Sequence, residues 1–258
     1  MRERRLTAAR GSLIVHLMVK YRTLPASRAL VLGALVLGWT CAGGGSAACA
    51  AEAAAAAVYP DMAPIAQYLS ADVAGEIALA RSAAPPAIAG NAEIRVLQPD
   101  GYRIEVPGRN GFVCLVERSW AKNFDSSDFW NPKIRAPHCF NAAAARSVLP
   151  GYLLRTAWVV GGVPRRDMPA RTAAAVAAHE MGPPESGSLA YMMSKQGYLG
   201  DDAGGPWHPH LMFFMPRMAD DAWGANVQGS PIFADSSGPE QVTVFFVPVR
   251  RWSDGTPD

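Results

Sequence analysis

The stretch Glu93-Ile-Arg-Val-Leu-Gln-Pro-Asp-Gly-Tyr-Arg-Ile-Glu-Val106 decides the fold class of this chain. Apolar and polar residues alternate over Glu93–Leu97 and again over Tyr102–Val106, which is the period of a half-buried β-strand. Between them, Gln98–Gly101 contains the Pro, Asp and Gly residues that favour a tight turn. The stretch therefore predicts a β-hairpin of two antiparallel strands.

Elements of other kinds are expected on both sides of this hairpin. Before it, an apolar stripe predicts a helix over residues 62–83 with Asp61 as its N-cap. After it, we expect a strand over 111–117 and then a structured loop over 119–138. Further helices are expected over 142–148, 152–160 and 166–179, and further strands over 189–193, 209–215 and 242–247. The first of these helices would be capped by Asn141 and stopped by Pro150-Gly151. The last strand is apolar on both faces, as a central strand would be. This order predicts an α+β fold, with a mainly antiparallel sheet and helices inserted between the early and late strands.

The first fifty residues have the layout of an export signal. A basic segment ends at Arg28, a short apolar run follows over 29–37, and small residues fill 42–50. With Gly38 and Trp39 the run is about 11 residues long, whereas a transmembrane helix needs roughly 20. We therefore expect a cleaved signal over 1–50, with Met18 as the true start, and a periplasmic or secreted protein.

The remaining chain is expected to form one domain. A flexible leader over 51–60, a single globular domain over 61–252 and a loose C-terminal tail over 253–258 are predicted. A lipid anchor through Cys49 or Cys41 is the less favoured alternative. Neither cysteine is preceded by the residues of a complete lipoprotein signal. After signal cleavage no stretch is long and apolar enough for a stable membrane span.

Removal of the signal would reverse the net charge. The full chain has 24 Lys and Arg against 22 Asp and Glu, for a net charge of +2. Residues 1–50 hold seven of the basic side chains and one of the acidic ones, so 17 and 21 are left, for −4. An acidic protein does not attract the phosphates of nucleic acid, so we expect no nucleic-acid partner.

Cysteine usage predicts one cross-link. Cleavage after residue 50 leaves Cys114 and Cys139, and a single pair in an exported chain is typical of a disulfide. The alternative is two reduced, buried thiols. A metal site is less favoured, because neither cysteine has a CxxC partner.

Aromatic side chains gather between the two cysteines, with short polar residues among them. Exposed rings beside polar groups can bind a small molecule or a cell-wall ligand. The alternative is that the rings form a small core beneath a long loop. The candidate ligand-binding residues are Trp120, Phe124, Phe129 and Trp130.

The segment Trp207-His-Pro-His210 is a candidate metal site. On an extended strand His208 and His210 would share one face with Met212, which suits Zn or Cu. The alternative is that Pro stiffens the start of a strand and both histidines hydrogen-bond to loops. A third ligand would have to come from His138, His179, Glu180, Asp201 or Asp202.

Established catalytic motifs are missing from the sequence. It has no HExxH, GxSxG, GxGxxG or Walker pattern, and no cofactor is predicted. The first hypothesis is an exported domain that binds a ligand through the aromatic loop, without catalysis. The alternative is a metal-dependent enzyme, hydrolase-like, centred on His208 and His210.

Several stretches together resemble a group of uncharacterised exported bacterial proteins. The resemblance spans nearly the whole chain after the signal, and the group has no assigned activity, so it implies export but no function. The stretches that carry it are Gly111–Cys114, Arg118–Trp120, Phe129–Lys133, Cys139–Asn141, Tyr191–Lys195, Trp207–Phe214 and Trp252–Pro257.

Overall fold

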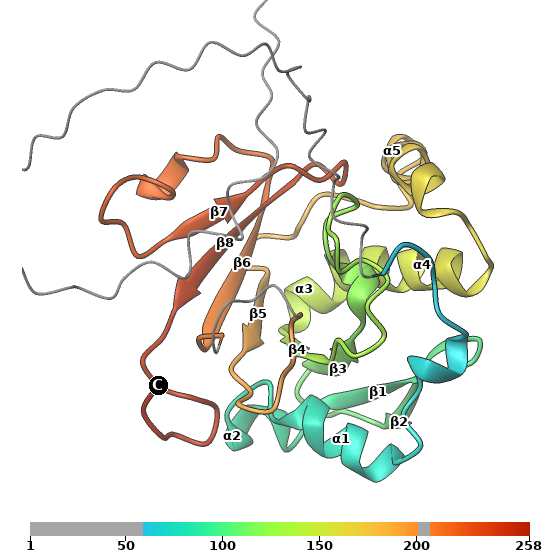
Figure 1. The fold of residues 1–258 in the computed structure, drawn as a ribbon. Helices are drawn as coiled ribbons and strands as arrows, with labels where there is room; N and C mark the ends of the chain where they lie inside the picture. Colours follow the sequence, from blue (N-terminus) through green and yellow to red (C-terminus); the bar gives the residue numbers. More distant parts are fainter. Residues whose placement is uncertain (1–58, 201–206) are drawn as a thin grey trace, which may run out of the picture.

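The computed structural model describes residues 59–200 and 207–258 (Figure 1). The expected signal over 1–50 and most of the expected leader therefore lie outside the described residues. Eight strands form one sheet in the order β2-β1-β3-β4-β5-β6-β8-β7. Every neighbouring pair is antiparallel except β1 and β3, which are parallel. The strands are β1 (Glu93–Gln98), β2 (Gly101–Val106), β3 (Val113–Glu117), β4 (Ala136–Phe140), β5 (Leu189–Met192), β6 (His210–Pro216), β7 (Phe233–Asp235) and β8 (Val242–Pro248).

Helices lie on both faces of this sheet, so the α+β class is confirmed (Figure 1). Helices α1 and α2 pack on one face, against Ile94, Val116 and Cys139. Helices α3 and α4 pack on the other face, against Leu115, Phe140 and Phe214. The helices are α1 (Val73–Arg81), α2 (Pro86–Ala89), α3 (Ala142–Ser147), α4 (Leu149–Val160) and α5 (Met168–Ala177). Short 3-10 turns are η2 (Ile65–Gln67), η3 (Ser119–Ala121), η4 (Arg165–Asp167) and η5 (Ala222–Gly224).

The hairpin predicted from residues 93–106 is confirmed. Strands β1 and β2 pair antiparallel, with Leu97 opposite Tyr102 and Gln98 opposite Gly101, so that Pro99 and Asp100 make a two-residue loop. Gly101 has a φ of +126°, a conformation that residues with a Cβ rarely adopt. The turn chemistry of the sequence thus fixes the register of the first two strands.

The predicted disulfide is present. Cys114 in β3 and Cys139 in β4 are direct cross-strand partners, bonded to each other and fully buried on the α1 face of the sheet. The bond joins positions 25 residues apart in the sequence. It closes the loop that leads from η3 to β4.

The helix expected over 62–83 is wrong in its first half. The chain makes η2 and then a turn with bends over 68–71, and α1 begins only after Asp72, whose Oδ1 accepts the Gly75 N–H at 2.8 Å. Tertiary packing overrides the helical pattern because Tyr68 is fully buried and donates its hydroxyl to the Trp130 carbonyl. The N-cap is therefore Asp72 and not Asp61.

The loop expected over 119–138 includes the first residues of β4, a strand that was not predicted from the sequence. Pro137 lies inside β4, opposite Val116. The Cα atoms of the pair Cys114–Cys139 lie 3.9 Å apart, which marks a pair that exchanges no backbone hydrogen bonds. Pro137, two residues away, therefore directs its missing donor away from β3, toward a side where β5 pairs only with Cys139 and Phe140.

The stop expected at Pro150-Gly151 is also wrong. α3 ends at Ser147 and α4 begins at Leu149, so Pro150 occupies the first turn of α4, where its missing N–H costs no helical hydrogen bond. Asn141 caps α3 as predicted, because its Oδ1 accepts the Ala144 N–H at 2.9 Å. The short strand β7 was not predicted either, and it places β8 between β6 and β7.

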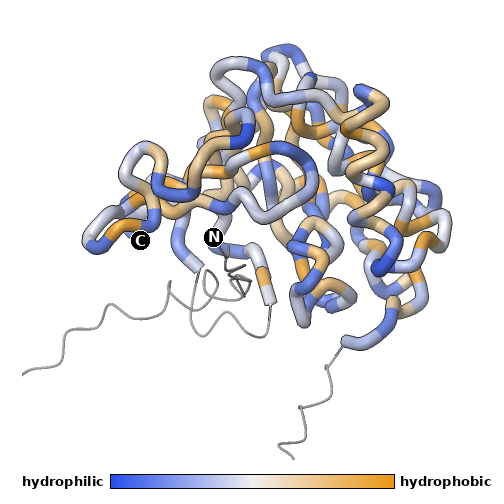
Figure 2. Tube along the Cα trace, turned by 90° about the horizontal axis from the view of Figure 1, so that it is seen from above, coloured by the Kyte–Doolittle hydropathy of each residue, from blue (hydrophilic) through white to orange (hydrophobic). Residues whose placement is uncertain are grey.

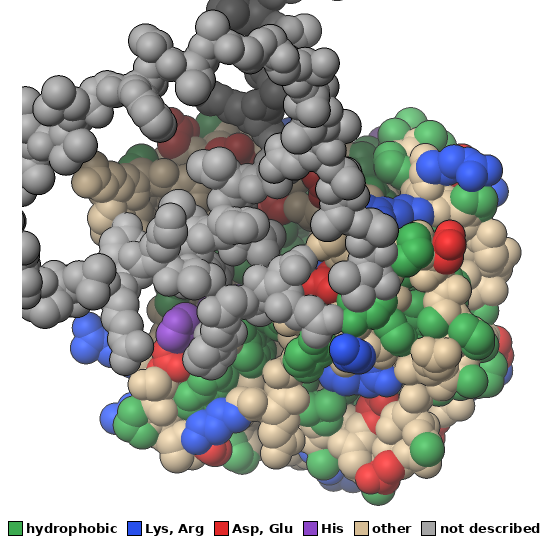
Figure 3. Space-filling view, viewed as in Figure 1, with side chains coloured by type: hydrophobic (Ala, Val, Ile, Leu, Met, Phe, Trp, Pro, Cys, Tyr) green, Lys and Arg blue, Asp and Glu red, His purple; other side chains and the backbone are tan. Residues whose placement is uncertain are grey.

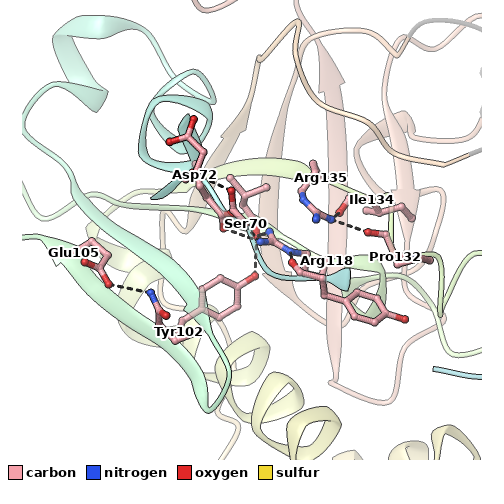
Figure 4. A network of polar contacts seen from close by, with 12 residues as sticks. Ser70, Asp72, Tyr102, Glu105, Arg118, Pro132, Ile134 and Arg135 are labelled. Carbon is pink, nitrogen blue, oxygen red and sulfur yellow. Dashed lines mark hydrogen bonds and ion pairs between the residues drawn. The ribbon is translucent and has the colours of Figure 1, made fainter. Parts of the chain in front are cut away.

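A buried ion pair ties α1 to the end of β3. Nη2 of Arg118 lies 2.7 and 2.9 Å from the two carboxylate oxygens of Glu76, and its Nε donates to the Tyr68 carbonyl at 2.6 Å. The hydroxyl of Tyr102 donates to the Val116 carbonyl at 2.7 Å. Figure 4 shows Tyr102 and Arg118 pointing toward this common region, where β2, β3 and α1 are joined.

The C-terminal tail is not loose. Arg251 forms a bridge with Pro257, and the Ser253 N–H donates to the Met193 carbonyl at 2.9 Å. Asp258 reaches back to His208 through its carboxylate. These bonds hold residues 253–258 against the body of the protein, which corrects the expectation from composition.

Short apolar segments alternate with polar ones along the described trace (Figure 2). Among the described residues no helix has both the length and the apolar character to cross a membrane.

Candidate functional site

Three of the four rings proposed as a binding surface are buried in the core. The exposed fractions of Trp120, Phe129 and Trp130 are 2%, 0% and 6%. The indole N–H of Trp120 donates to Oγ1 of Thr156 on α4 at 3.0 Å. Only Phe124 is half-buried, and the guanidinium of Arg155 lies 4.3 Å from its ring centroid. These rings anchor the loop onto α4, so they do not offer the exposed surface that the sequence suggested.

The two histidines of the candidate metal site have other partners. His208 is exposed, and its Nδ1 lies 2.7 Å from a carboxylate oxygen of Asp258. His210 is buried at the start of β6, and its Nδ1 lies 2.8 Å from the His208 carbonyl. Both interactions are the loop hydrogen bonds that the alternative interpretation expected.

The proposed third metal ligands are spread over the fold. His138 is buried in β4, whereas His179 and Glu180 are exposed after α5. Asp201 and Asp202 lie outside the described residues. Within the part of the chain that the structure describes, no group of three or more His, Cys, Asp or Glu side chains could hold a metal ion.

His138 instead faces a buried carboxylate. Its Nδ1 lies 3.2 Å from Oε2 of Glu117 on β3, and the exposed fractions of the two side chains are 1% and 7%. The orientation is not that of a hydrogen bond, and both ring nitrogens and Oε1 of Glu117 have no hydrogen-bond partner. Buried polar atoms without partners are costly, so this pair is an unusual feature for a core.

A hollow of about 10 Å³ adjoins this carboxylate. That volume is close to the smallest that holds one water molecule. The residues around it include Glu117, Arg118, Trp120, Tyr152 and Arg155.

A larger cavity of about 130 Å³ shares Tyr152 and Arg155 with this hollow. It lies on the α3–α4 side of the sheet, between α4 and the strands β6, β8 and β7. Its apolar wall comes from Val148, Met181, Phe214, Val242 and Val244, and its polar wall from Asn123, Ser147, Tyr152, Arg155, Asp235 and Glu240. The combination of an apolar wall with a few converging polar groups is typical of a small-molecule site.

Arg155 is the central charge of this cavity. The Nη1 of Arg155 lies 3.2 Å from the carbonyls of Trp120 and Lys122, and its Nη2 is paired with the carboxylate of Glu240. Burial lowers the pKa of Arg155, while the nearby Tyr152 and Glu117 raise it. Burial has the opposite effect on an acid: it raises the pKa of Tyr152, so the phenol stays neutral at physiological pH.

None of the cavity residues was singled out from the sequence. Two signals were present: Arg155 interrupts the apolar face of the helix over 149–160, and Glu117 ends a strand whose five residues are all buried. A charged side chain on a face that must be buried needs a partner or a function. Outside the cavity, basic and acidic side chains are mixed over the visible part of the face in Figure 3.

Comparison with known proteins found no matching family model, no matching curated protein and no matching solved structure. The candidate function therefore rests on the geometry of this cavity alone.

Proposed function

We propose that this protein is an exported domain that binds a small ligand in the cavity between α4 and the strands β6, β8 and β7. The observation that carries the proposal is the cavity itself, with its volume of about 130 Å³, its apolar wall and a few polar groups, of which Arg155 is buried. An apolar cavity of roughly 150 Å³ in a protein core accepts benzene, so a ligand of a few carbon atoms fits here. The site differs from the aromatic loop first expected, but the kind of function is the same.

Export is part of this proposal. The basic, apolar and small-residue order of residues 1–50 is typical of a cleaved signal. The Cys114–Cys139 disulfide is compatible with an oxidising compartment. Expression of the full chain in a bacterium, followed by fractionation and mass spectrometry, tests this: we expect a periplasmic or secreted product that begins near residue 51, and an uncleaved cytoplasmic product would contradict it.

A cavity-filling substitution tests the binding site. Val244 lines the cavity from β8, so Val244→Phe should occupy its volume. Amide NMR shifts of Gly151 and Gly182, which also line it, would report titration with a set of four-carbon amines, alcohols and acids. We expect at least one probe to shift these amides in the wild type and at least tenfold weaker binding in Val244→Phe.

Val227→Phe is the matched control, because Val227 is half exposed in the loop before β7 and does not line the cavity. It should bind the probes as the wild type does. Shifts that survive Val244→Phe, or no shift with any probe, would contradict the proposed site.

The metal-dependent enzyme centred on His208 and His210 stays a prediction. Elemental analysis of purified protein, with the melting temperature measured before and after zinc or copper addition, tests it. Stoichiometric metal, lost in His208→Ala, would support it.

A further inference from the structure

The charges around the cavity are unequal. Arg155 is the cation among its lining residues, and Asp235 and Glu240 are the carboxylates. A third carboxylate, Glu117, lines the adjoining hollow, and its Oε1 is buried without a hydrogen-bond partner. Arg118 also lines this hollow, but its charge is paired with Glu76, so the cavity and the hollow together carry more negative than positive charge.

The guanidinium of Arg155 already has partners within the protein. One of its nitrogens contacts two backbone carbonyls and another is paired with Glu240. An anionic ligand would have to compete with these contacts in a buried position. Arg155 and Glu240 together therefore present a neutral pair to the cavity.

Neutral groups hold the carboxylate of Asp235. Its Oδ2 accepts from the amide of Asn123 at 3.0 Å and its Oδ1 accepts the Ser237 N–H at 2.8 Å. Both donors are neutral, so they orient the carboxylate without compensating it. A cation in the cavity would find here a fixed and uncompensated partner.

Two aromatic rings complete this wall. Tyr152 on α4 and Phe214 on β6 line the same cavity as Asp235. Ring faces attract organic cations, and carboxylates beside aromatic rings are a common way to hold an ammonium group. The valines and Met181 on the remaining wall would take a short apolar substituent.

We propose that the ligand of this cavity is a small organic cation, an ammonium group that carries a short apolar chain. The ammonium group lies at Asp235, against the rings of Tyr152 and Phe214, and the chain lies against Val148, Met181 and Val244. This inference rests on the proposed ligand-binding function, and it goes beyond that function by naming the chemical class of the ligand.

Three probes of equal length separate the outcomes: n-butylamine, 1-butanol and butyrate at pH 7, with affinities measured from the same amide shifts. We expect the amine to bind at least tenfold more tightly than the alcohol, and butyrate to bind most weakly. Equal or tighter binding of the alcohol or of butyrate would overturn the inference while leaving the binding site intact. No binding of any probe would overturn the proposed function itself.

Charge substitutions make the test specific. Asp235→Asn removes the uncompensated charge at constant size, and it should weaken the amine at least about tenfold but the alcohol less than twofold. The double variant Asp235→Asn with Glu240→Gln leaves Arg155 unbalanced and should reverse the preference toward butyrate. Asp221→Asn, an exposed change of the same kind outside the cavity, should leave all three affinities unchanged. An amine preference that survives Asp235→Asn would overturn the assigned ammonium position.

Discussion

Glu76 and Arg118 form a fully buried ion pair that joins α1 to the end of β3. The exposed fractions of the side chains are 2% and 0%, and one guanidinium nitrogen lies within 2.9 Å of both carboxylate oxygens. The other contacts of Arg118 are the backbone carbonyls of Tyr68 and Val116. The negative charge next to Arg118 thus comes from Glu76, so the two residues depend on each other.

Removal of Glu76 should strongly destabilise the fold. Glu76→Ala leaves the Arg118 charge buried without compensation, and we expect the free energy of unfolding to fall by about 3–5 kcal/mol. Urea unfolding followed by circular dichroism measures it. Glu185→Ala is the control, because Glu185 pairs with Arg146 at the surface and its loss should cost less than about 1 kcal/mol. Equal effects of the two substitutions would contradict this account.

The disulfide should contribute measurably to stability. Replacement of Cys114 and Cys139 by Ala together releases a loop of 25 residues in the unfolded chain, which costs about 3.5 kcal/mol by loop entropy. Equilibrium unfolding of the double variant and the wild type gives the difference. A thiol titration of the denatured, unreduced chain that begins at residue 51 should find neither Cys114 nor Cys139 free, and two reactive thiols would show that the bond does not form.

Stability should fall on acidification because of His210. The pKa of His210 is lowered from 6.5 to about 4, chiefly by burial; the hydrogen bond with the His208 carbonyl opposes this shift, and the nearby His138 and His208 add to it. Between these two values the unfolded state binds a proton that the folded state does not, so the unfolding free energy decreases as the pH falls from about 6.5 to 4. The shift corresponds to roughly 3 kcal/mol. Unfolding measured across this range should show a shallower slope in His210→Asn, and identical slopes would refute the assignment.

Asn141 should matter more than an ordinary helix cap. Its Oδ1 accepts from Ala144 and from Leu189, and its Nδ2 donates to the Gly187 carbonyl, so one side chain joins α3 to β5. Asn141→Ala should cost about 2 kcal/mol or more. Asp72→Ala, which loses only the cap of α1, should cost about 1 kcal/mol. Thermal unfolding of the two variants side by side gives the comparison.

Local signals in the sequence were sufficient for much of the fold. The hairpin over 93–106, the cap at Asn141 and the disulfide depend on neighbouring residues or on a count of cysteines. The errors arose where distant contacts decide the structure. The predicted helix is interrupted after Tyr68, whose buried side chain bonds to Trp130, and Pro137 is accepted in β4 because β5 ends before it.

The candidate site was hidden for the same reason. Arg155, Asp235 and Glu240 are separated by up to 85 residues and meet only after the sheet has formed. Conversely, Trp120 and Phe129 attracted attention as aromatic residues in a polar loop, and nothing local shows that they turn inward. A charged residue on an otherwise apolar helix face, such as Arg155, is the local signal that indicates such a site.

The order of strands in the sheet has a consequence for how the protein is made. Apart from the hairpin at one edge and the exchange of β7 and β8 at the other, each new strand adds beside the previous one along the chain. Chains emerge N-terminus first during synthesis, and contacts close in sequence form fastest. The sheet can therefore grow in one direction, from the β1–β2 hairpin toward β7 and β8. The cavity is completed last, because β7 and β8 supply its final wall, so binding competence should be the latest property that the chain acquires.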